Sequence, residues 1–332
     1  MTVHLPLLTV SRARSFRRCA RHHLFSYEQG YRPIETSGPL AFGTLWHEGQ
    51  ETWWSSRRAD RLEVALSVVR NNSDGIDPFE LVKLEELMVA YDTRWCDVAM
   101  QVERVECKFE LELRNPQTGA ASRTWRRGGK IDAIVTVNGV PWMVEHKTTS
   151  EDISPGSAYW QKLRLDAQVS TYLDGARSLG FDVRGCIYDV VAKPALRQLK
   201  ATAPEARKYT KEGKLYANQR AEDETTEEFR LRLRENIAEN PERYFGRGEV
   251  IRTPEEEAEA AWDLWQIARA IREAELQNRH PRNPEACFYW NKACEYFSVC
   301  TGSESLENPL RFRKLEHVNE ELQDATDNHA TE

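Results

Sequence analysis

The sequence contains no hydrophobic run that approaches the ~18 residues needed to cross a membrane. We therefore expect none of its 332 residues to form a transmembrane helix. The first residues, MTVHLPLLTVSRARSFRRC, place a short apolar run before a group of arginines. A secretory signal peptide has the opposite order, so the sequence predicts a cytoplasmic protein with no membrane contact.

An ATP-binding P-loop, GxxxxGK(S/T), is also missing, so the chain carries no recognisable helicase motor. An excess of positive charge is missing as well. The net charge of −7 argues against a generic nucleic-acid binder, but the charge is uneven. Residues 11–32 are rich in arginine and histidine, whereas residues 302–332 are acidic and are expected to form a flexible tail.

The cysteine content does not fit a disulfide framework. Seven cysteines, an odd number, occur in a large chain without an export signal. Three of them, Cys287, Cys294 and Cys300, fall close together near the C-terminus. This clustering indicates a specific role for these thiols.

The order of the hydrophobic patterns predicts one α/β domain with helical additions. Helical patterns cover residues 9–29, with Ser11 as the expected N-cap, and then 40–54, 60–70, 78–100, 157–179 and 254–278. Period-two alternation in VECKFELEL predicts a half-buried strand, and three more strands are expected at 124–137, 140–148 and 184–192. Residues 195–250 are charged and are expected to be largely helical.

The most informative stretch is the predicted hairpin around Asn138-Gly139, a dipeptide typical of a two-residue type I′ turn. In that register Asp132 lies opposite Glu145, and Lys130 lies opposite Lys147. Opposed side chains of like charge repel one another, whereas a divalent cation between the two carboxylates would favour this arrangement. A register shifted by one residue, or two solvated acids at a strand end, would remove the need for a metal.

Two further sets of residues share helical faces. His47 lies four residues after Gly43 and four before Glu51. Gln168 and Tyr172 are spaced in the same way, just after the acidic strand. Taken alone, the histidine could be structural, and the Gln168–Tyr172 pair could serve only packing and capping.

In combination, these residues resemble the PD-(D/E)XK nuclease superfamily, in its RecB-like branch. This branch includes CRISPR-associated adaptation nucleases, AddB-type recombination nucleases and many phage exonucleases. Its pattern is a helical histidine, an aspartate in a G-x-I-D strand, Glu-x-Lys, and then Gln-x-x-x-Tyr. The matching residues stand in the same order here: His47, Asp132 in GKIDAI, Glu145-His146-Lys147, and Gln168 with Tyr172.

The resemblance implies a restriction-endonuclease-like fold, a mixed central sheet flanked by helices. It implies Mg²⁺ or Mn²⁺ as the cofactor, held by His47, Asp132, Glu145 and the backbone carbonyl of His146. The implied catalytic residues are Asp132, Glu145, Lys147, Gln168 and Tyr172. Lys147 would orient the attacking water and stabilise the transition state, while Gln168 and Tyr172 would bind DNA or position the site. The core would cover residues 40–193, preceded by an N-terminal segment, 1–39, and followed by a helical extension, 194–301, and the acidic tail, 302–332.

The cysteines extend the resemblance, because several RecB-like nucleases hold an iron–sulfur cluster with one cysteine before the core and three after it. Cys19, Cys287, Cys294 and Cys300 match that arrangement and imply a 4Fe–4S cluster that joins the N- and C-terminal helical segments. The six residues between Cys287 and Cys294, where two are common in the family, put one ligand in doubt. Zinc bound by four thiolates and a set of buried free thiols are the alternatives.

Arginines near the two predicted sites are candidates for DNA contact. Arg14, Arg17 and Arg18 lie near the first cluster cysteine, and Arg127 lies in the strand that carries Asp132. A solvated helix face is the alternative for the first three.

The sequence thus predicts a metal-dependent deoxyribonuclease, an exonuclease acting on single-stranded DNA or duplex ends in recombination, repair or phage DNA processing, in a bacterial cell or a phage-infected host. It would act alone or beside a helicase or recombination protein. A CRISPR-adaptation-like nuclease that trims DNA within a complex is one alternative. A non-catalytic DNA-binding iron–sulfur protein and an electron-transfer protein are two others.

Overall fold

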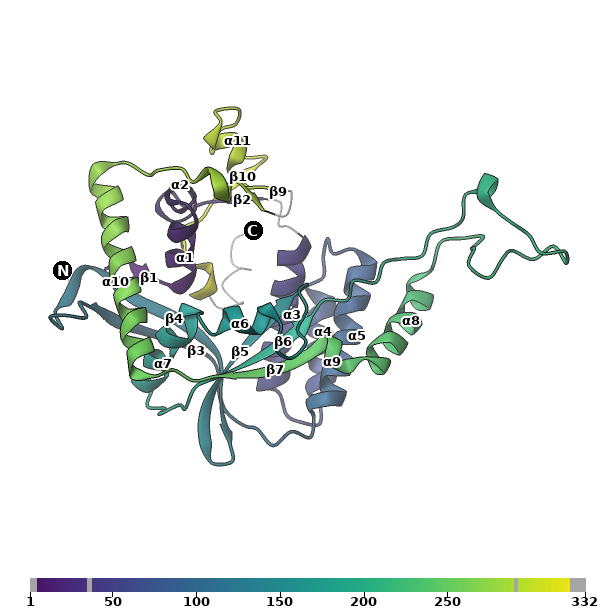
Figure 1. The fold of residues 1–332 in the computed structure, drawn as a ribbon, viewed down its shortest axis with the longest axis horizontal. Coiled ribbons are helices and arrows are strands. Elements are labelled where there is room, and N and C mark those ends of the chain that lie inside the picture. The colour runs from purple at the N-terminus through teal and green to yellow at the C-terminus, as the bar shows by residue number, and fades with distance from the viewer. Residues whose placement is uncertain (1–4, 35–37, 290–291, 323–332) are drawn as a thin grey trace.

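A mixed six-stranded sheet forms the centre of the computed structural model, which describes residues 5–34, 38–289 and 292–322 (Figure 1). The sheet has the order β1-β4-β5-β6-β7, and β3 pairs with β4 along nearly its whole length. Neighbours are antiparallel in β3–β4, β4–β5 and β6–β7 and parallel in β1–β4 and β5–β6. The strands are β1 (Leu7–Leu8), β3 (Gln101–Arg114), β4 (Ala121–Val137), β5 (Val140–Thr149), β6 (Cys186–Ala192) and β7 (Phe245–Val250). The predicted mixed α/β fold is confirmed.

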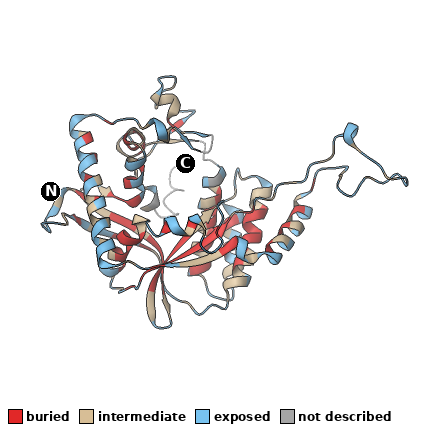
Figure 2. Cartoon of the chain, in the orientation of Figure 1, coloured by how far each residue is buried: buried red, intermediate tan, exposed pale blue. Residues whose placement is uncertain are grey.

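One face of the sheet is covered by five helices, of which three precede β3 in the sequence and two follow β6. These are α3 (Gly38–Ser55), α4 (Arg61–Asn71), α5 (Pro78–Trp95), α8 (Thr226–Glu239) and α9 (Pro241–Tyr244). They share a hydrophobic cluster with alternate residues of the sheet, such as Ala133 and Val135 of β4 and Val144 of β5. Figure 2 shows this buried layer between the helices and the strands. Alternation along each strand sends the neighbouring residues to the opposite face.

The opposite face is covered by α6 (Ala158–Leu163) and α7 (Ala167–Ser178). One continuous helix was expected over 157–179, but the chain is interrupted at residues 164–166. Asp166 is the reason for the new start, because its side chain accepts a hydrogen bond from the Gln168 backbone N–H at 3.0 Å and caps α7. This restart sets the orientation of Gln168 at the first turn of α7.

The N- and C-terminal segments pack together beside the sheet (Figure 1). They comprise α1 (Val10–Arg18), α2 (Ala20–His23), the π-helix η1 (Leu24–Glu28), β2 (Tyr31–Pro33), α10 (Pro254–Gln277), the 3₁₀ turn η3 (Pro284–Ala286), β8 (Phe288–Tyr289), β9 (Lys292–Ala293), α11 (Phe297–Cys300), β10 (Phe312–Lys314) and the 3₁₀ turn η4 (Glu320–Leu322). The N-cap of α1 is Thr9, which accepts from the Arg12 backbone N–H at 3.1 Å, and not the expected Ser11. The expectation of a flexible tail from residue 302 is wrong for β10, which pairs with β2, and residues 323–332 lie outside the described residues.

The stretch expected to be helical over 195–250 differs most from the prediction. Residues 195–224, which we call the arm, project away from the body and contain only one short 3₁₀ turn, η2 (Pro204–Ala206) (Figure 1). Helix α8 starts only after Thr225, whose side chain forms a reciprocal capping box with Glu228. Residues 245–250 then form β7 of the central sheet, so the sheet extends beyond the predicted core boundary at residue 193.

Among the helices of the described residues, none has the length and apolar character that a bilayer span requires.

Candidate active site

The predicted hairpin forms with the predicted register. Asn138 and Gly139 have φ angles of 51° and 78°, as a type I′ turn requires. The β4–β5 pairs run from Val137 opposite Val140 to Ala133 opposite Val144. Beyond that pair the two strands no longer form a regular ladder.

The charged residues of the predicted site lie just beyond the last β4–β5 ladder pair, so their contacts differ from those that the register predicts. Asp132 is not in a ladder pair with Glu145; its carboxylate accepts a hydrogen bond from the backbone N–H of His146 at 2.7 Å. The expected opposition of Lys130 and Lys147 also lies beyond the last ladder pair. On the other side of β4, Lys130 lies opposite Lys108 of β3, and its ammonium forms an ion pair with Glu106.

The two carboxylates are nevertheless buried close together, with Asp132 and Glu145 only 9% and 5% exposed. Burial, followed by the charge of Asp132, raises the pKa of Glu145 to about 7. Two such groups disfavour each other's ionised form in a poorly hydrated site. A positive charge between them would relieve this repulsion.

Lys147 and Gln168 hold the Glu145 carboxylate. The Lys147 Nζ lies 2.5 Å from Glu145 Oε1, and the Gln168 side-chain N–H donates to the same oxygen at 2.6 Å. The Gln168 carbonyl oxygen also accepts from Lys147 at 3.0 Å, which closes a three-residue ring. Burial alone would lower the pKa of Lys147, but the negative charges of Glu145 and Asp132 raise it, so the ammonium stays charged.

Two glycines, Gly129 and Gly175, have no side chain and so allow α7 to lie close enough for these contacts. A Cβ at Gly129 in β4 would stand 2.6 Å from the ring of Tyr172, and one at Gly175 in α7 would stand 2.5 Å from the ring of Phe109. The rings of Phe109 and Tyr172 meet edge to face between the helix and the sheet. Burial raises the pKa of Tyr172 well above its ordinary value, so its hydroxyl stays protonated near the site.

His47 lies on α3, across from the same strand. Its ring centroid is 6.4 Å from that of His146, and a Cβ at Gly43, one helical turn earlier, would lie 3.3 Å from Thr148 of β5. Removal from water lowers the pKa of His47 to about 4, against the raising effect of Asp132. A neutral imidazole keeps a nitrogen lone pair available for a metal ion.

These residues fit a divalent cation in part. Two buried carboxylates, a neutral histidine and a backbone carbonyl are the oxygen and nitrogen donors that Mg²⁺ or Mn²⁺ accepts. Across residues 5–34, 38–289 and 292–322, however, no three His, Cys, Asp or Glu side chains converge as a preformed ligand set. The carboxylate of Glu145 is turned to Lys147 and Gln168, and one oxygen of Asp132 to the His146 N–H. Magnesium needs only one or two carboxylates in addition to water and phosphate oxygens.

A comparison with protein families decides the assignment. The model of the PD-(D/E)XK nuclease superfamily matches residues 7–301. The chain belongs to the PD-(D/E)XK nuclease superfamily. Members of this superfamily act on nucleic acid and generally use divalent metals.

Solved structures give more distant similarities. A protein from Eubacterium rectale, provisionally named an exonuclease, is 12% identical, with 91% of this chain and 90% of that chain covered and a TM-score of 0.44. The protein SSO0001 is 13% identical, with 79% and 84% covered and a TM-score of 0.30. No curated protein matches the chain.

Glu106 is an acidic residue beside the candidate site that the sequence pattern did not predict. The alternation of its strand predicts a solvent-facing side chain, but Glu106 lies opposite Asp132, between the Val105–Ala133 and Cys107–Ile131 pairs. Its φ of 52° is unusual for a residue other than glycine and interrupts the alternation. Burial raises its pKa to about 7, against the pull of Lys130. Glu106 therefore adds a third acidic group to the site, which no short motif announced.

A buried polar network behind His146 was also missed. The His146 Nδ1 lies 3.5 Å from Asp189 Oδ2, which the Arg247 guanidinium contacts at 3.2 Å. Tyr91 donates a further hydrogen bond to the same carboxylate oxygen. The network joins α5, β5, β6 and β7 and fixes the strand between Glu145 and Lys147. Asp189 could have been noted as the single acid in the apolar run CIYDVVA.

The four predicted cluster cysteines of the nuclease are brought together. Cys19, Cys287, Cys294 and Cys300 all line one small pocket between the N- and C-terminal segments. The Asn283 backbone N–H lies 3.4 Å from the Cys19 Sγ, and the Cys294 N–H donates to the Cys287 carbonyl at 2.7 Å. The pKa of Cys300 is raised by burial and by the nearby Cys19 and Cys287 thiols, and burial raises that of Cys294 to about 12. Their common pocket is compatible with a shared ligand, although these side chains too are not a preformed metal set.

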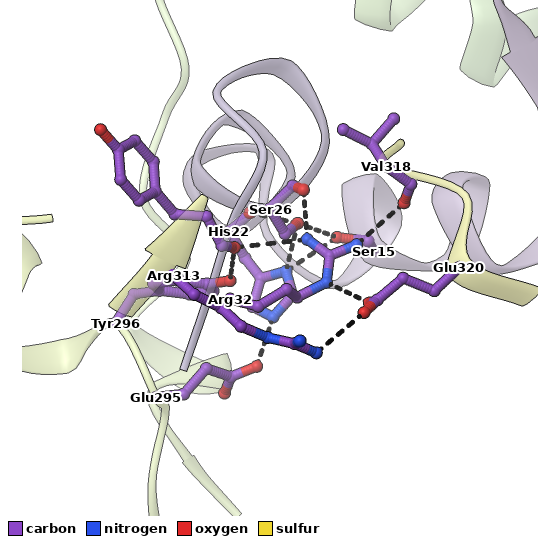
Figure 3. A network of polar contacts seen from close by, with 10 residues as sticks. Ser15, His22, Ser26, Arg32, Glu295, Tyr296, Arg313, Val318 and Glu320 are labelled. Carbon is purple, nitrogen blue, oxygen red and sulfur yellow. Dashed lines mark hydrogen bonds and ion pairs between the residues drawn. The ribbon is translucent and has the colours of Figure 1, made fainter. Parts of the chain in front are cut away.

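Polar contacts beside this pocket join the same two segments (Figure 3). The His22 ring lies 2.7 Å from Glu295, and the Tyr296 hydroxyl donates to the Tyr31 carbonyl at 2.7 Å. The Arg32 guanidinium contacts both Glu320 and the Val318 carbonyl. The segments are therefore joined by protein contacts in addition to the cysteines.

The candidate DNA-contacting arginines differ in their surroundings. Arg14, Arg17 and Arg18 are exposed, and Arg18 lines the cysteine pocket. Arg14 forms an ion pair with Asp166 at 3.1 Å. Arg127 is partly buried and paired with Asp174 at 2.7 Å.

Proposed function

We propose that this nuclease is a metal-dependent deoxyribonuclease, and specifically an exonuclease that acts on single-stranded DNA or duplex ends. One observation carries the proposal. Asp132 and Glu145 are buried, Lys147 is half-buried beside them, and Gln168 of α7 holds the side chains of Glu145 and Lys147 in fixed positions. A structural role alone gives no reason to bury two mutually repelling carboxylates beside a lysine.

Asp132, Glu145, His47 and the carbonyl of His146 would hold a Mg²⁺ or Mn²⁺ ion. Such an ion, when bound, polarises the phosphate and lowers the pKa of its water. Lys147 keeps its charge and would orient the attacking water and stabilise the negative charge that develops on the phosphate. Gln168 fixes Lys147 and Glu145, and the protonated hydroxyl of Tyr172 would position the site or contact the DNA.

We further propose that Cys19, Cys287, Cys294 and Cys300 hold a 4Fe–4S cluster, with a zinc ion as the chemical alternative. Their shared pocket supports this reading, and four thiolates suit either group. Iron and sulfide analysis of anaerobically purified protein separates the two. Arg14, Arg17, Arg18 and Arg127 remain candidate contacts to DNA.

Two further proposals concern the proteins with which the nuclease works. The nuclease could trim DNA within a CRISPR-adaptation-like complex, or act beside a separate helicase or recombination protein. A non-catalytic DNA-binding iron–sulfur protein is disfavoured, because the charged set is complete and its members contact one another. Weak activity of the isolated protein, together with stable co-purification of a partner, would favour trimming within a complex.

A nuclease assay tests the proposal directly. End-labelled single-stranded and double-stranded DNA is incubated with the wild type and with Lys147→Ala, in Mn²⁺, Mg²⁺ or EDTA. We expect cleavage that depends on the metal and falls by about 100-fold or more in the variant, since a transition-state charge partner is lost. The ladder of products gives the polarity of cleavage.

A second lysine variant shows whether the loss of cleavage is specific to Lys147. Lys193→Ala removes a lysine from the strand end three residues past Val190, the register partner of Lys147, and should leave the rate of cleavage near that of the wild type. Absence of cleavage by folded, cluster-loaded wild type under every metal condition would overturn the proposal of a nuclease that acts alone.

A further inference from the structure

The arm (residues 195–224) leaves the sheet at the edge that carries the active site. In the β5–β6 ladder Val190 lies beside Lys147, and Ala192 lies beside Thr149. The Lys193 N–H then donates to the Thr149 carbonyl at 2.7 Å, just before the arm begins. At ~3.3 Å per residue, the root of the arm is roughly 13 Å along the strand from Lys147.

The base of the arm is fixed by its acidic residues. The Glu224 carboxylate accepts from the Leu199 backbone N–H at 2.8 Å and from Arg232 at 2.7 Å. Asp223 accepts from the Ala201 N–H at 2.8 Å and pairs with Lys200. The negative charges of Asp223 and Glu224 are therefore used within the protein, where they hold the two ends of the arm together.

The outer part of the arm is a basic hairpin. The Tyr216 N–H donates to the Lys208 carbonyl at 3.1 Å, and the Thr210 N–H donates to the Lys214 carbonyl at 2.7 Å across a turn at Gly213, where φ is 76°. Residues 207–220 hold five Lys and Arg against one Glu, in a chain whose net charge is −7. The exposed ammonium groups of Lys208, Lys211 and Lys214 have no ion-pair partner in the part of the chain that the structure describes.

The arm also has no core of its own. None of residues 195–223 is buried, and Figure 2 draws the projecting segment in the exposed and intermediate colours. Tyr209 and Tyr216 are 55% and 46% exposed beside the three lysines. Unpaired cations interleaved with exposed aromatic rings are typical of surfaces that bind a phosphate backbone and stack on bases or sugars.

We propose that the arm is a DNA clamp, which holds the phosphate backbone of the substrate outside the active site. This inference rests on the proposed function for the identity of the nucleic acid. Lys208, Lys211 and Lys214 would neutralise phosphates, and Tyr209 and Tyr216 would contact the sugars or bases. The shared sheet edge favours the nuclease's own substrate over an acidic protein as the partner.

The test is a measurement of DNA affinity in EDTA, where cleavage does not interfere. Fluorescence anisotropy compares the wild type with Lys208→Gln/Lys211→Gln/Lys214→Gln on labelled single-stranded DNA and on a blunt duplex, from 50 to 200 mM salt. We expect weaker binding, and a slope of log affinity against log salt that falls by about 2 to 3, since each lost phosphate contact removes about 0.7 to 0.9. With Mg²⁺ or Mn²⁺ present, KM should rise while kcat at saturating DNA stays unchanged.

A matched control carries the same loss of charge elsewhere. Arg123→Gln/Arg269→Gln/Arg279→Gln removes three exposed cations from β4, α10 and the turn after α10. It should keep most of the wild-type salt slope, and thermal unfolding should show that both triple variants are folded. Unchanged affinity in the lysine variant, an equal loss in both variants, or no DNA binding by the wild type would each overturn the clamp.

The outcomes separate the clamp from the nuclease proposal. Arm-dependent DNA binding without any cleavage would overturn the nuclease proposal and support the clamp. Cleavage that requires Lys147, with affinity and KM that do not change when the arm lysines are replaced, would support the nuclease proposal and overturn the clamp. Tyr209→Ser/Tyr216→Ser should weaken binding to single strands more than to the duplex, because unpaired bases offer their faces for stacking.

Discussion

The β4–β5 hairpin and the arm start from the same edge of the sheet, yet they treat charge in opposite ways. At the site end of the hairpin the charged groups face other groups of the protein: Lys147 faces Glu145, and Lys130 faces Glu106. In the arm the outer lysines project into solvent. Packing on both faces of the sheet fixes the charges of the hairpin, whereas turns and backbone hydrogen bonds alone fix those of the arm. Enclosed charges suit a reaction, and projecting charges suit a partner.

The largest contrast should come from neutralising an acid in each region. Asp132→Asn keeps an oxygen that can accept from the His146 N–H but loses the negative charge, so kcat should fall by about 100-fold or more. Glu212→Gln at the exposed tip of the arm should leave kcat unchanged. Single-turnover cleavage at saturating DNA measures both variants. A rate for Asp132→Asn within about threefold of the wild type would break the contrast and remove Asp132 from the chemistry.

A small enlargement of one side chain should separate the two regions by its effect on stability. Gly129→Ala places a Cβ 2.6 Å from the Tyr172 ring and should destabilise the fold by about 1–3 kcal/mol, as overpacking does. In a strand without such a contact, replacing glycine by alanine tends to stabilise the fold. Ala217→Val in the exposed arm should stay within about 0.5 kcal/mol of the wild type. Urea unfolding provides both values, and equal stability of Gly129→Ala and the wild type would contradict the close approach of α7.

The smallest effect on stability should come from the cysteine region. Its ion pair between His22 and Glu295 is less enclosed than the charges of the hairpin and less exposed than those of the arm. Burial disfavours the Glu295 carboxylate, but the hydrogen bond from His22 and other favourable contacts lower its pKa to about 2. Because this folded-state pKa lies below the unfolded value of about 4.3, the stabilisation is present above that pH and is lost as the pH falls toward 2. The side chain is 35% exposed, so the gain is at most about 1 kcal/mol.

The measurement is a pair of stability curves from pH 6 to pH 2.5. The free energy of unfolding of the wild type should fall more steeply than that of Glu295→Gln, and the two curves should approach each other at low pH. Parallel curves would show that the His22–Glu295 contact does not form in solution.

The hairpin could be predicted in detail because its signals are local. Asn138-Gly139 fixes the turn, and the alternation of apolar residues fixes the register that Ala133 and Val144 confirm. The ordered motif then predicted candidate site residues, of which Asp132, Glu145, Lys147, Gln168 and Tyr172 lie together. The four cysteines also share one pocket.

The features that the sequence did not predict depend on distant parts of the chain. Glu106 looks like an ordinary solvent-facing residue, and only its positive φ turns it toward Asp132. The arm contains enough charged residues to resemble a helical segment, but Pro194 precedes it and Pro204 and Gly213 interrupt it. Turns and contacts at its base, such as that of Glu224 with Leu199, fix it in place of a helix. Strand β7 is short, and its place in the sheet is set by Asp189 and Arg247, which are 58 residues apart.

The pocket lined by Cys19 and Cys287 has a consequence for the order of folding. Cys19 contacts Asn283, a residue 264 positions later, so this region closes only after nearly the whole chain has been synthesised. The central sheet, complete at Val250, contains the hairpin and most of its supporting helices and can assemble earlier during translation. Cys19 and Arg21 are then synthesised long before their partners Asn283 and His280. Joining the chain over so long a loop adds an entropic cost that grows only slowly with its length.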